Sequence, residues 1–337
     1  MQRQQQITAW LHKILPTQDY SCEPASSDAS FRRYFRIEYQ QAGKHISQIL
    51  MDAPPDKEDS EPFISVAQLM EQRGINVPKI IAQDLALGFL LLTDLGNDQY
   101  LGQIREDNVD RLYQDALDAL FLLQKSALPD NSAIPPPYDN ALLMREMALF
   151  PEWYVDTHLN VRLSDIQQVK LQAVFESLSQ SALAQPQVLV HRDFHSRNLM
   201  LTKTQNPGVL DFQDAVIGAV SYDLVSLLRD CYISWPRARV ETWALKYLQR
   251  CQLAGIIPST DEAILLRWFD WMGVQRHLKA IGIFARLNHR DGKPGYLQDI
   301  PRTLAYVTDV TGRYNELNPL HEILSQLPPM DGKEKSA

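Results

Sequence analysis

The sequence contains little cysteine and no long apolar run, and both absences limit what the protein can be. Its three cysteines, Cys22, Cys231 and Cys251, lie far apart and form no CxxC pair, which argues against a disulfide framework and against a zinc site. No apolar run approaches the roughly 18 residues of a membrane span, and the N-terminus lacks the apolar segment of a signal peptide. We therefore expect a soluble protein of the reducing cytoplasm, with no membrane partner.

Positive charge is also scarce. The net charge of the 337 residues is −8, so the chain has no overall basic field that would attract nucleic acid or anionic lipid. Any phosphate must therefore be bound by local groups. A hydrophobic content of 45% suffices for one large core or two smaller ones, and the length favours two lobes. Nothing in the sequence indicates nucleic acid or an obligate protein as a partner.

The chain is predicted to be rich in strands first and in helices later. Residues 30–52 contain two extended runs separated by the turn-like stretch QQAGKH, which predicts an antiparallel hairpin. Residues 61–73 place apolar side chains on one helical face and end before Gly74, a candidate C-cap. The stretch GFLLLTDLG predicts a buried strand. After residue 100 the apolar spacing becomes three and four, which predicts long helices, and Pro151 is expected to end one of them.

One stretch points to chemistry: VLVHRDFHSRNLM, residues 188–200, follows an apolar run with His-Arg-Asp, four residues and then Asn. Asp193 and Asn198 therefore have the spacing of a kinase catalytic loop. Asp211, in VLDFQD, stands at a predicted strand end, where a metal-binding Asp belongs in kinases. Phosphoryl transfer needs a carboxylate that orients the acceptor hydroxyl and oxygen ligands that fix Mg²⁺. The three residues together favour that chemistry.

The alternative interpretation is a hydrogen-bonded turn after a buried strand, with Asp211 as a second acid at a strand end. That interpretation would suffice for an isolated His-Arg-Asp triplet. The correctly spaced Asn, the second Asp and the order of strands and helices together favour a kinase. A protein kinase is disfavoured, because only nine residues separate Asp211 from Ser221 and leave no room for an activation segment.

With these motifs the sequence resembles the aminoglycoside-phosphotransferase and choline-kinase-like superfamily, over most of residues 25–310. The stretches SDASFRRYFRI, MDAPPDKED, HRDFHSRNLM, GVLDFQDAV and YDLVSLLRDCYISWP are most similar to the bacterial anomeric kinases that phosphorylate N-acetylmuramate and N-acetylglucosamine in cell-wall recycling. The resemblance implies an α+β, bilobal protein-kinase-like fold, with ATP and Mg²⁺ as cofactors. It makes Asp193 the catalytic base, and Asn198 and Asp211 the Mg²⁺ ligands.

The resemblance also divides the chain into lobes. Residues 1–93 are expected to form an N-lobe whose antiparallel sheet and helix cover the nucleotide. Residues 94–327 are expected to form a mainly helical C-lobe with the hinge, the catalytic loop and the acceptor site. Residues 328–337 are expected to be disordered. By position, the adenine contacts fall to Thr93, Asp94 and Leu95.

The sequence departs from the family pattern where the nucleotide phosphates should be held. No GxGxxG precedes the first hairpin. The Ser30 hydroxyl in SSDASFRR, or a tight turn of backbone N–H groups, would have to replace the glycines, and a solvated serine-rich loop is the alternative. The Lys expected at the end of the third strand is missing, since Met51 and Asp52 stand there. The missing charge falls to Arg32, Arg33 or Lys57, unless the first two are ordinary exposed strand arginines.

Two positions near the catalytic loop each have two interpretations. Asp223, with Tyr222, either closes the loop from below, as in related small-molecule kinases, or caps the helix DLVSLL. His195 either touches the acceptor or bonds a neighbouring carbonyl group.

The expected acceptor region reverses the charge of the chain. Residues 265–302 carry seven basic residues against three acidic ones, whereas a site for a polycationic aminoglycoside should be lined with carboxylates. An anionic or neutral sugar fits this balance better. Trp271 either stacks on a sugar ring or belongs to the core, and Glu146 is a candidate acceptor ligand by family position alone. The lactyl carboxylate of N-acetylmuramate is expected at Arg276, Lys279 or Arg286, with a solvated basic face as the alternative.

The sequence thus predicts a cytoplasmic, ATP- and Mg²⁺-dependent kinase that phosphorylates the anomeric hydroxyl of N-acetylmuramate, N-acetylglucosamine or both. One alternative is a kinase for another hydroxylated metabolite or an aminoglycoside. A second is a nucleotide-binding pseudokinase, because the phosphate-binding Lys and glycines are missing. The intact set of Asp193, Asn198 and Asp211 favours an enzyme.

Overall fold

The computed structural model describes residues 2–27, 31–125 and 135–328. By its internal contacts the chain divides into two units, Met1–Ala119 with Asn198–Asp214, and Leu120–Arg197 with Ala215–Ala337. The lobe boundary at residue 93 stays a prediction. From residue 329 on, the tail expected to be disordered lies outside the described residues. None of the helices in the described part of the chain combines the length and the apolar composition that crossing a bilayer requires.

The first unit contains an antiparallel sheet whose strand order is β1-β2-β3-β5-β4. Its strands are β1 (Tyr20–Ser27), β2 (Arg33–Gln41), β3 (Lys44–Asp52), β4 (Ile80–Asp84) and β5 (Phe89–Thr93). The predicted hairpin is confirmed as β2 and β3, which pair from Gln41 and Lys44 outward. Ala42 and Gly43 both have positive φ, which a two-residue hairpin turn requires. β5 confirms the predicted strand, whereas β1 and β4 lack a clear sequence pattern.

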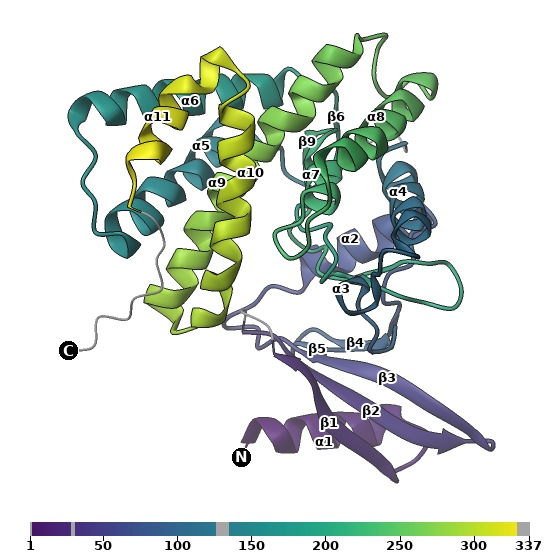
Figure 1. The fold of residues 1–337 in the computed structure, drawn as a ribbon. Coiled ribbons are helices and arrows are strands. Elements are labelled where there is room, and N and C mark those ends of the chain that lie inside the picture. Colours follow the sequence, from purple (N-terminus) through teal and green to yellow (C-terminus); the bar gives the residue numbers. More distant parts are fainter. Residues whose placement is uncertain (1, 28–30, 126–134, 329–337) are drawn as a thin grey trace. The chain divides into compact units, whose positions relative to one another are not determined.

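A helix covers one face of this sheet. In α1 (Gln2–Ile14) the residues Ile7, Trp10 and Leu11 recur at helical spacing and are buried. They form one apolar cluster with sheet residues such as Ile37 and Leu50, and Figure 1 shows α1 lying along the strands. Burial of such side chains contributes about 1.5–3 kcal/mol each, so this packing orders the N-terminal helix.

The rest of the first unit is helical apart from one short ladder. Helix α2 (Glu61–Gln72) confirms the predicted helix and ends before Gly74, whose φ of +79° marks a C-terminal cap. One further helix follows within the unit, a second runs across the boundary between the units, and a two-stranded ladder completes the first unit. These elements are α3 (Tyr100–Gln103), α4 (Val109–Lys125), β7 (Leu199–Met200) and β8 (Gly208–Val209).

The second unit is mainly helical, with one short antiparallel pair, β6 and β9. Its elements are α5 (Asn140–Leu149), η1 (Phe150–His158), α6 (Asp165–Leu183), β6 (Gln187–Val190), β9 (Val216–Ala219), α7 (Tyr222–Leu228), α8 (Arg237–Leu253), α9 (Glu262–Asp291), η2 (Pro294–Asp299), α10 (Ile300–Thr311), η3 (Asn315–Leu317) and α11 (Asn318–Gln326).

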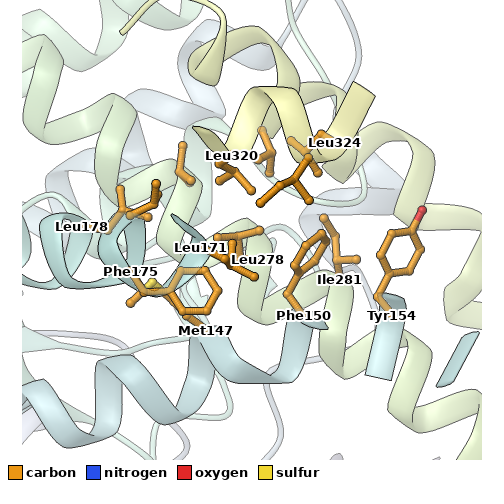
Figure 2. Packing of buried hydrophobic residues seen from close by; sticks show 14 of the residues in the cluster. Met147, Phe150, Tyr154, Leu171, Phe175, Leu178, Leu278, Ile281, Leu320 and Leu324 are labelled. Carbon is orange, nitrogen blue, oxygen red and sulfur yellow. The ribbon is translucent and has the colours of Figure 1, made fainter. Parts of the chain in front are cut away.

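The long helix α9 organises this unit, because it packs against α5, α6, α7, α8, α10, η1 and η2. Figure 2 shows side chains from α5, η1, α6, α9 and α11 meeting in one apolar cluster. Gly282 lets α9 approach the junction of α5 and η1 closely. A Cβ atom at Gly282 would lie 2.4 Å from the carbonyl carbon of Leu149. The functional side chains of α9 therefore stand on a rigid support.

The prediction that Pro151 ends a helix is wrong. The helical path of α5 continues directly into η1, a π-helix in which Pro151 occupies one of the first positions. Proline is tolerated in a first helical turn, because its missing N–H has no partner there in any case. The sequence rule correctly marks a change of helix type here, but the chain stays helical.

Candidate active site

The catalytic loop begins where β6 ends, and a buried carboxylate holds its backbone. Asp223 of α7 accepts the N–H of His191 at 2.6 Å and the N–H of Arg192 at 3.0 Å. These bonds stabilise Arg192 at a φ of +77°, which is rare for a residue with a side chain. Burial raises the pKa of Asp223 to about 7, although the two N–H donors oppose that rise. Asp223 therefore closes the loop, and it is not the cap of α7, which begins after Ser221.

A buried polar cluster, here called the Glu146 cluster, lies beside this loop and consists of Glu146, Arg192, Lys279, Tyr138 and Tyr222. Glu146 Oε1 lies 2.5 Å from Arg192 Nη2 and 3.3 Å from Lys279 Nζ, and its other oxygen accepts the Tyr138 hydroxyl. Lys279 also donates to the Tyr222 hydroxyl at 3.2 Å. Burial would raise the pKa of Glu146, but Lys279 and Arg192 hold it below its ordinary value. Glu146 and Lys279, both expected at the acceptor, are thus paired with each other.

Asp193 follows in the loop and is surrounded by positive charge. Burial alone would raise the pKa of its carboxyl, but Lys279, His195, Arg276 and Arg192 lower that pKa to about 2. Its backbone is fixed at both groups, since its N–H donates to His191 Nδ1 and its carbonyl oxygen accepts the His195 N–H. Asp193 is therefore ionised at neutral pH and can accept a hydrogen bond from a hydroxyl group.

Sequence reasoning missed a second cluster, here called the Arg197 cluster, which consists of His195, Arg197, Asp230, Tyr232 and Tyr296. The Arg197 guanidinium carbon lies 3.7 Å from the ring centroid of Tyr232 and 5.7 Å from that of Tyr296. The His195 ring meets the Tyr232 ring edge-on at 5.3 Å. Tyr232 and Asp230 lie in the quoted stretch RDCYISWP and Arg197 in HRDFHSRN, but no spacing rule singles them out.

Asp230 fixes this cluster to the loop. One of its carboxylate oxygens accepts the N–H and the hydroxyl of Ser196, at 2.9 and 2.5 Å, and the other accepts the Tyr232 N–H at 2.9 Å. Burial lowers the pKa of His195, with Arg276 and Arg197 adding to this effect and Asp230 and Asp193 opposing it. His195 is therefore neutral at neutral pH. Its Nδ1 is buried and has no hydrogen-bond partner in the described part of the chain.

The other two predicted acceptor residues lie deeper in the second unit. Arg276 is only 5% exposed, its Nη1 contacts Cys231 Sγ at 3.7 Å, and its Nε has no partner among the residues described. Trp271 belongs to the apolar cluster to which α5, η1, α6, α9 and α11 contribute, and its ring packs edge-on against Tyr314 with Arg267 stacked on it. Of the two interpretations of Trp271, the surroundings observed here agree with a residue of the core.

The predicted metal ligands come together in the first unit. Asn198 Nδ2 donates to Asp211 Oδ2 at 3.3 Å, and Gln213 donates to the other carboxylate oxygen at 2.7 Å. The β7–β8 ladder positions both, because the Leu210 N–H bonds the Asn198 carbonyl oxygen. Asp211 has a φ of +62°, a strained conformation that is frequent at functional sites.

The chemistry of these donors fits Mg²⁺. A carboxylate and an amide carbonyl are hard oxygen ligands, and Mg²⁺ in kinases takes few protein ligands and completes its shell with phosphate oxygens and water. Among the residues described, no group of three or more His, Cys, Asp or Glu could hold a metal by itself. Asp211 and Asn198 therefore suit an ion that arrives with a nucleotide.

The predicted phosphate contacts lie at the end of β3. Asp52 is fully buried there and pairs with Arg33 of β2 and with Arg3 of α1. A carboxylate that holds two arginines thus occupies the place of the expected Lys. Arg33 remains half exposed, with 51% of its side chain accessible. Ser30 lies outside the described residues.

The predicted adenine contacts follow β5. The Asp94 carboxylate accepts Arg36 Nε at 2.7 Å, the Ser47 hydroxyl at 2.5 Å and the Gly96 N–H at 2.9 Å. Arg36 and these other donors hold the pKa of Asp94 below its ordinary value despite the opposing effect of burial. Thr93 exchanges hydrogen bonds with the Lys79 backbone. These contacts fix the conformation of the segment.

Comparison with known proteins decides the family. The model of the phosphotransferase enzyme family matches residues 21–263. The chain belongs to this family. A relative from Pseudomonas putida, named N-acetylmuramate/N-acetylglucosamine kinase, is 50% identical over 96% of each chain. Another of the same name, from Pseudomonas aeruginosa, is 47% identical over 97% of each. Among solved structures, a choline kinase from Streptococcus pneumoniae matches with a TM-score of 0.62 at 11% identity, covering 92% of this chain and 100% of that chain.

Membership in the phosphotransferase family confirms two predictions from sequence. The protein is an enzyme of the kinase type, and its fold is α+β and protein-kinase-like, with an antiparallel sheet early in the chain and a mostly helical remainder. The roles of the individual site residues stay predictions, which the geometry above now makes specific.

Proposed function

We propose that this phosphotransferase transfers the γ-phosphoryl group of ATP to the anomeric hydroxyl of N-acetylmuramate or N-acetylglucosamine and releases the sugar 1-phosphate. The observation that carries the proposal is the 50% identity, over nearly the whole chain, with a relative named for both sugars. The positive groups near Asp193 support an anionic or neutral acceptor over a polycation. Because the reaction needs ATP, we also propose that the enzyme works in the cytoplasm.

Asp193 acts on the acceptor. Its ionised carboxylate accepts a hydrogen bond from the anomeric hydroxyl and aligns that oxygen for attack on the γ-phosphorus. As the new oxygen–phosphorus bond forms, the bond to the leaving ADP oxygen breaks and the hydroxyl proton passes to Asp193. A pKa of about 2 makes Asp193 a weak base, which is adequate because the anomeric hydroxyl is more acidic than other sugar hydroxyls and the transition state is loose.

Residues of the first unit bind the nucleotide. Asp211 and Asn198 would hold Mg²⁺, which neutralises charge on the phosphates when it is bound. Arg33, anchored by Asp52 and half exposed, supplies the positive charge that the missing Lys would give, together with the Ser30 segment. The backbone at Thr93, Asp94 and Leu95 receives the adenine. Because β3 ends in Asp52, where the family pattern has a Lys, a nucleotide-binding pseudokinase is the second candidate.

Turnover of the purified full chain tests the proposal. Mg·ATP should yield ADP only when N-acetylmuramate or N-acetylglucosamine is present, and phosphorus NMR should show a product phosphate coupled to the anomeric proton. Asp193→Asn should reduce kcat by about 10²–10⁴-fold while ATP affinity changes only a few-fold. Asp211→Ala should also weaken Mg·ATP binding.

Other outcomes would reject the assignment. ATP binding without turnover on any sugar favours the pseudokinase. A product phosphate coupled to a methylene group would mean that another hydroxyl is phosphorylated. A strong preference for an aminoglycoside would mean that the sugar assignment is wrong and only membership in the family stands. Full activity of both variants would show that the site residues are misassigned.

A further inference from the structure

Several arginines of the second unit stack on an aromatic ring and also pair with a carboxylate. The stacking directs the flat face of the guanidinium at the ring and leaves its N–H edge for an anion. Three examples combine both contacts: Arg192 with Tyr138 and Glu146, Arg229 with Phe269 and Asp270, and Arg267 with Trp271 and Glu316.

Arg197 has the stacking contacts without the anion. Its distance of 3.7 Å from the Tyr232 centroid is the shortest of these contacts, and Tyr296 lies on it as a second ring. Within residues 2–27, 31–125 and 135–328, the Arg197 side chain makes no hydrogen bond and no ion pair, and it is half-buried. Burial raises the pKa of the nearby Asp299 carboxyl and the charge of Arg197 opposes that rise, but no described carboxylate forms an ion pair with the guanidinium. Arg197 is therefore oriented as in an arginine–carboxylate site and has no direct anionic partner among the described residues.

The surroundings of Arg197 are rigid. Asp230 holds both the preceding residue, Ser196, and the stacking partner, Tyr232. Tyr296 is in turn stacked on Phe284 of α9, with ring centroids 5.7 Å apart. A guanidinium that is already oriented loses little conformational entropy when it binds a planar, bidentate anion such as a carboxylate.

The position of Arg197 links it to the reacting group. It follows Asp193 by four residues in the same loop, and both residues belong to the electrostatic surroundings of the His195 ring. Three other cations are occupied or enclosed, whereas Arg286 has a buried Nε without a hydrogen-bond partner among the described residues. Lys279 pairs with Glu146, and Arg276 is buried against Cys231. Arg302 donates to the Cys231 carbonyl oxygen and pairs with Asp299.

We propose that Arg197 determines acceptor specificity by binding the lactyl carboxylate of N-acetylmuramate. This inference rests on the proposed function. N-acetylglucosamine lacks the lactyl group, so the two sugars differ by the anion that Arg197 would bind. The assignment replaces the sequence-based expectation that Arg276, Lys279 or Arg286 receives this carboxylate.

The test measures kcat/KM for both sugars at saturating ATP, and KM for ATP, in three variants. Arg197→Gln should lower kcat/KM for N-acetylmuramate by about 10- to 100-fold, the effect of losing hydrogen bonds to a charged group. It should change the value for N-acetylglucosamine by less than about three-fold and leave KM for ATP unchanged. Arg197→Lys keeps the positive charge but loses the bidentate N–H geometry of the guanidinium. Its kcat/KM for N-acetylmuramate should therefore lie between those of the wild type and Arg197→Gln. Arg267→Gln, the matched stacked arginine with its own Glu316 partner, should leave the ratio between the sugars unchanged.

The opposite outcomes are equally distinct. An equal loss on both sugars with a higher KM for ATP would mean that Arg197 binds a nucleotide phosphate. An equal loss with unchanged KM for ATP would mean that it only shapes the loop. Either result overturns the inference while the proposed function stands. If the wild type turns over neither sugar, the proposed function fails and the inference fails with it. Should Arg197→Gln not fold, Arg197→Lys carries the same comparison.

Discussion

The Glu146 cluster and the Arg197 cluster share a local motif, an arginine beside a tyrosine ring, but differ in the partner of the arginine. Each takes an arginine from the catalytic loop and places it near a tyrosine ring, Arg192 with Tyr138 and Arg197 with Tyr232. In the Glu146 cluster the arginine has a buried carboxylate. In the Arg197 cluster the nearby carboxylate of Asp230 instead binds backbone and hydroxyl groups. The comparison shows that one arginine of the loop is held by an ion pair, whereas the other has no ion pair among the described residues.

The largest expected effect comes from opening the Glu146 cluster. Glu146→Ala would leave Arg192 and Lys279 buried without their shared carboxylate, which typically costs about 3–5 kcal/mol of the free energy of unfolding. Denaturant unfolding monitored by circular dichroism measures this loss. We also expect kcat to fall. Arg192 precedes Asp193 in the catalytic loop, and its N–H is one of the backbone groups that Asp223 binds.

A double-mutant cycle sharpens this prediction. Lys279→Met in the Glu146→Ala background removes one of the two uncompensated charges, so it should cost less there than in the wild type. If the effects of the two substitutions on the free energy of unfolding simply added, Glu146 and Lys279 would not share an ion-pair network.

A smaller effect should follow acidification. His277 of α9 stacks on Tyr306 and donates its Nε2–H to the Arg229 carbonyl oxygen. Burial, with the charge of Arg276, lowers its pKa to about 3, while the unfolded value is about 6.5. The unfolded state thus binds a proton more readily. The stabilising contribution is complete above pH 6.5 and is lost progressively as pH falls toward 3.

The linkage gives this loss a magnitude. Between pH 7 and pH 5, His277 should account for about 2 kcal/mol of the decrease in the free energy of unfolding. His277→Gln keeps a donor for the Arg229 carbonyl oxygen but does not titrate, so its unfolding free energy should fall less over the same interval. Parallel pH curves for the two proteins would mean that other groups govern the acid limb.

Sequence reasoning found those parts of the fold and site that depend on local spacing. The hairpin around Gly43, the helix that ends before Gly74 and the proximity of Asn198 to Asp211 follow from neighbouring residues, and all three are present. The pairing of Glu146 with Lys279 joins residues 133 positions apart in sequence, which no periodicity encodes. From the sequence, both residues are therefore expected at the acceptor, Glu146 by family position and Lys279 as one of the basic residues of residues 265–302.

The sequence does not predict the Arg197 cluster, for a related reason. Arg197 stands inside the quoted motif, but its meaning depends on Tyr232 and Tyr296, which the loop after α7 and the η2 segment bring to it. Only the tertiary structure shows that this arginine is stacked and forms no ion pair among the described residues. A sequence can indicate a surplus of basic residues in residues 265–302, but it cannot show which of them are already paired.

The smallest expected effect separates stability from specificity. Arg267→Gln removes a stacking contact and a partly exposed pair with Glu316, and surface pairs contribute only about 0.2–1 kcal/mol. Arg197→Gln removes stacking alone, so it should cost no more, about 0.5–1 kcal/mol. We therefore expect Arg267→Gln to be the more destabilising of the two in denaturant unfolding, although only Arg197→Gln changes the preference between the sugars. If Arg197→Gln lowered the free energy of unfolding by more than about 2 kcal/mol, the stacked guanidinium would be part of the supporting structure. The distinction between the ion-paired Glu146 cluster and the Arg197 cluster would then fail.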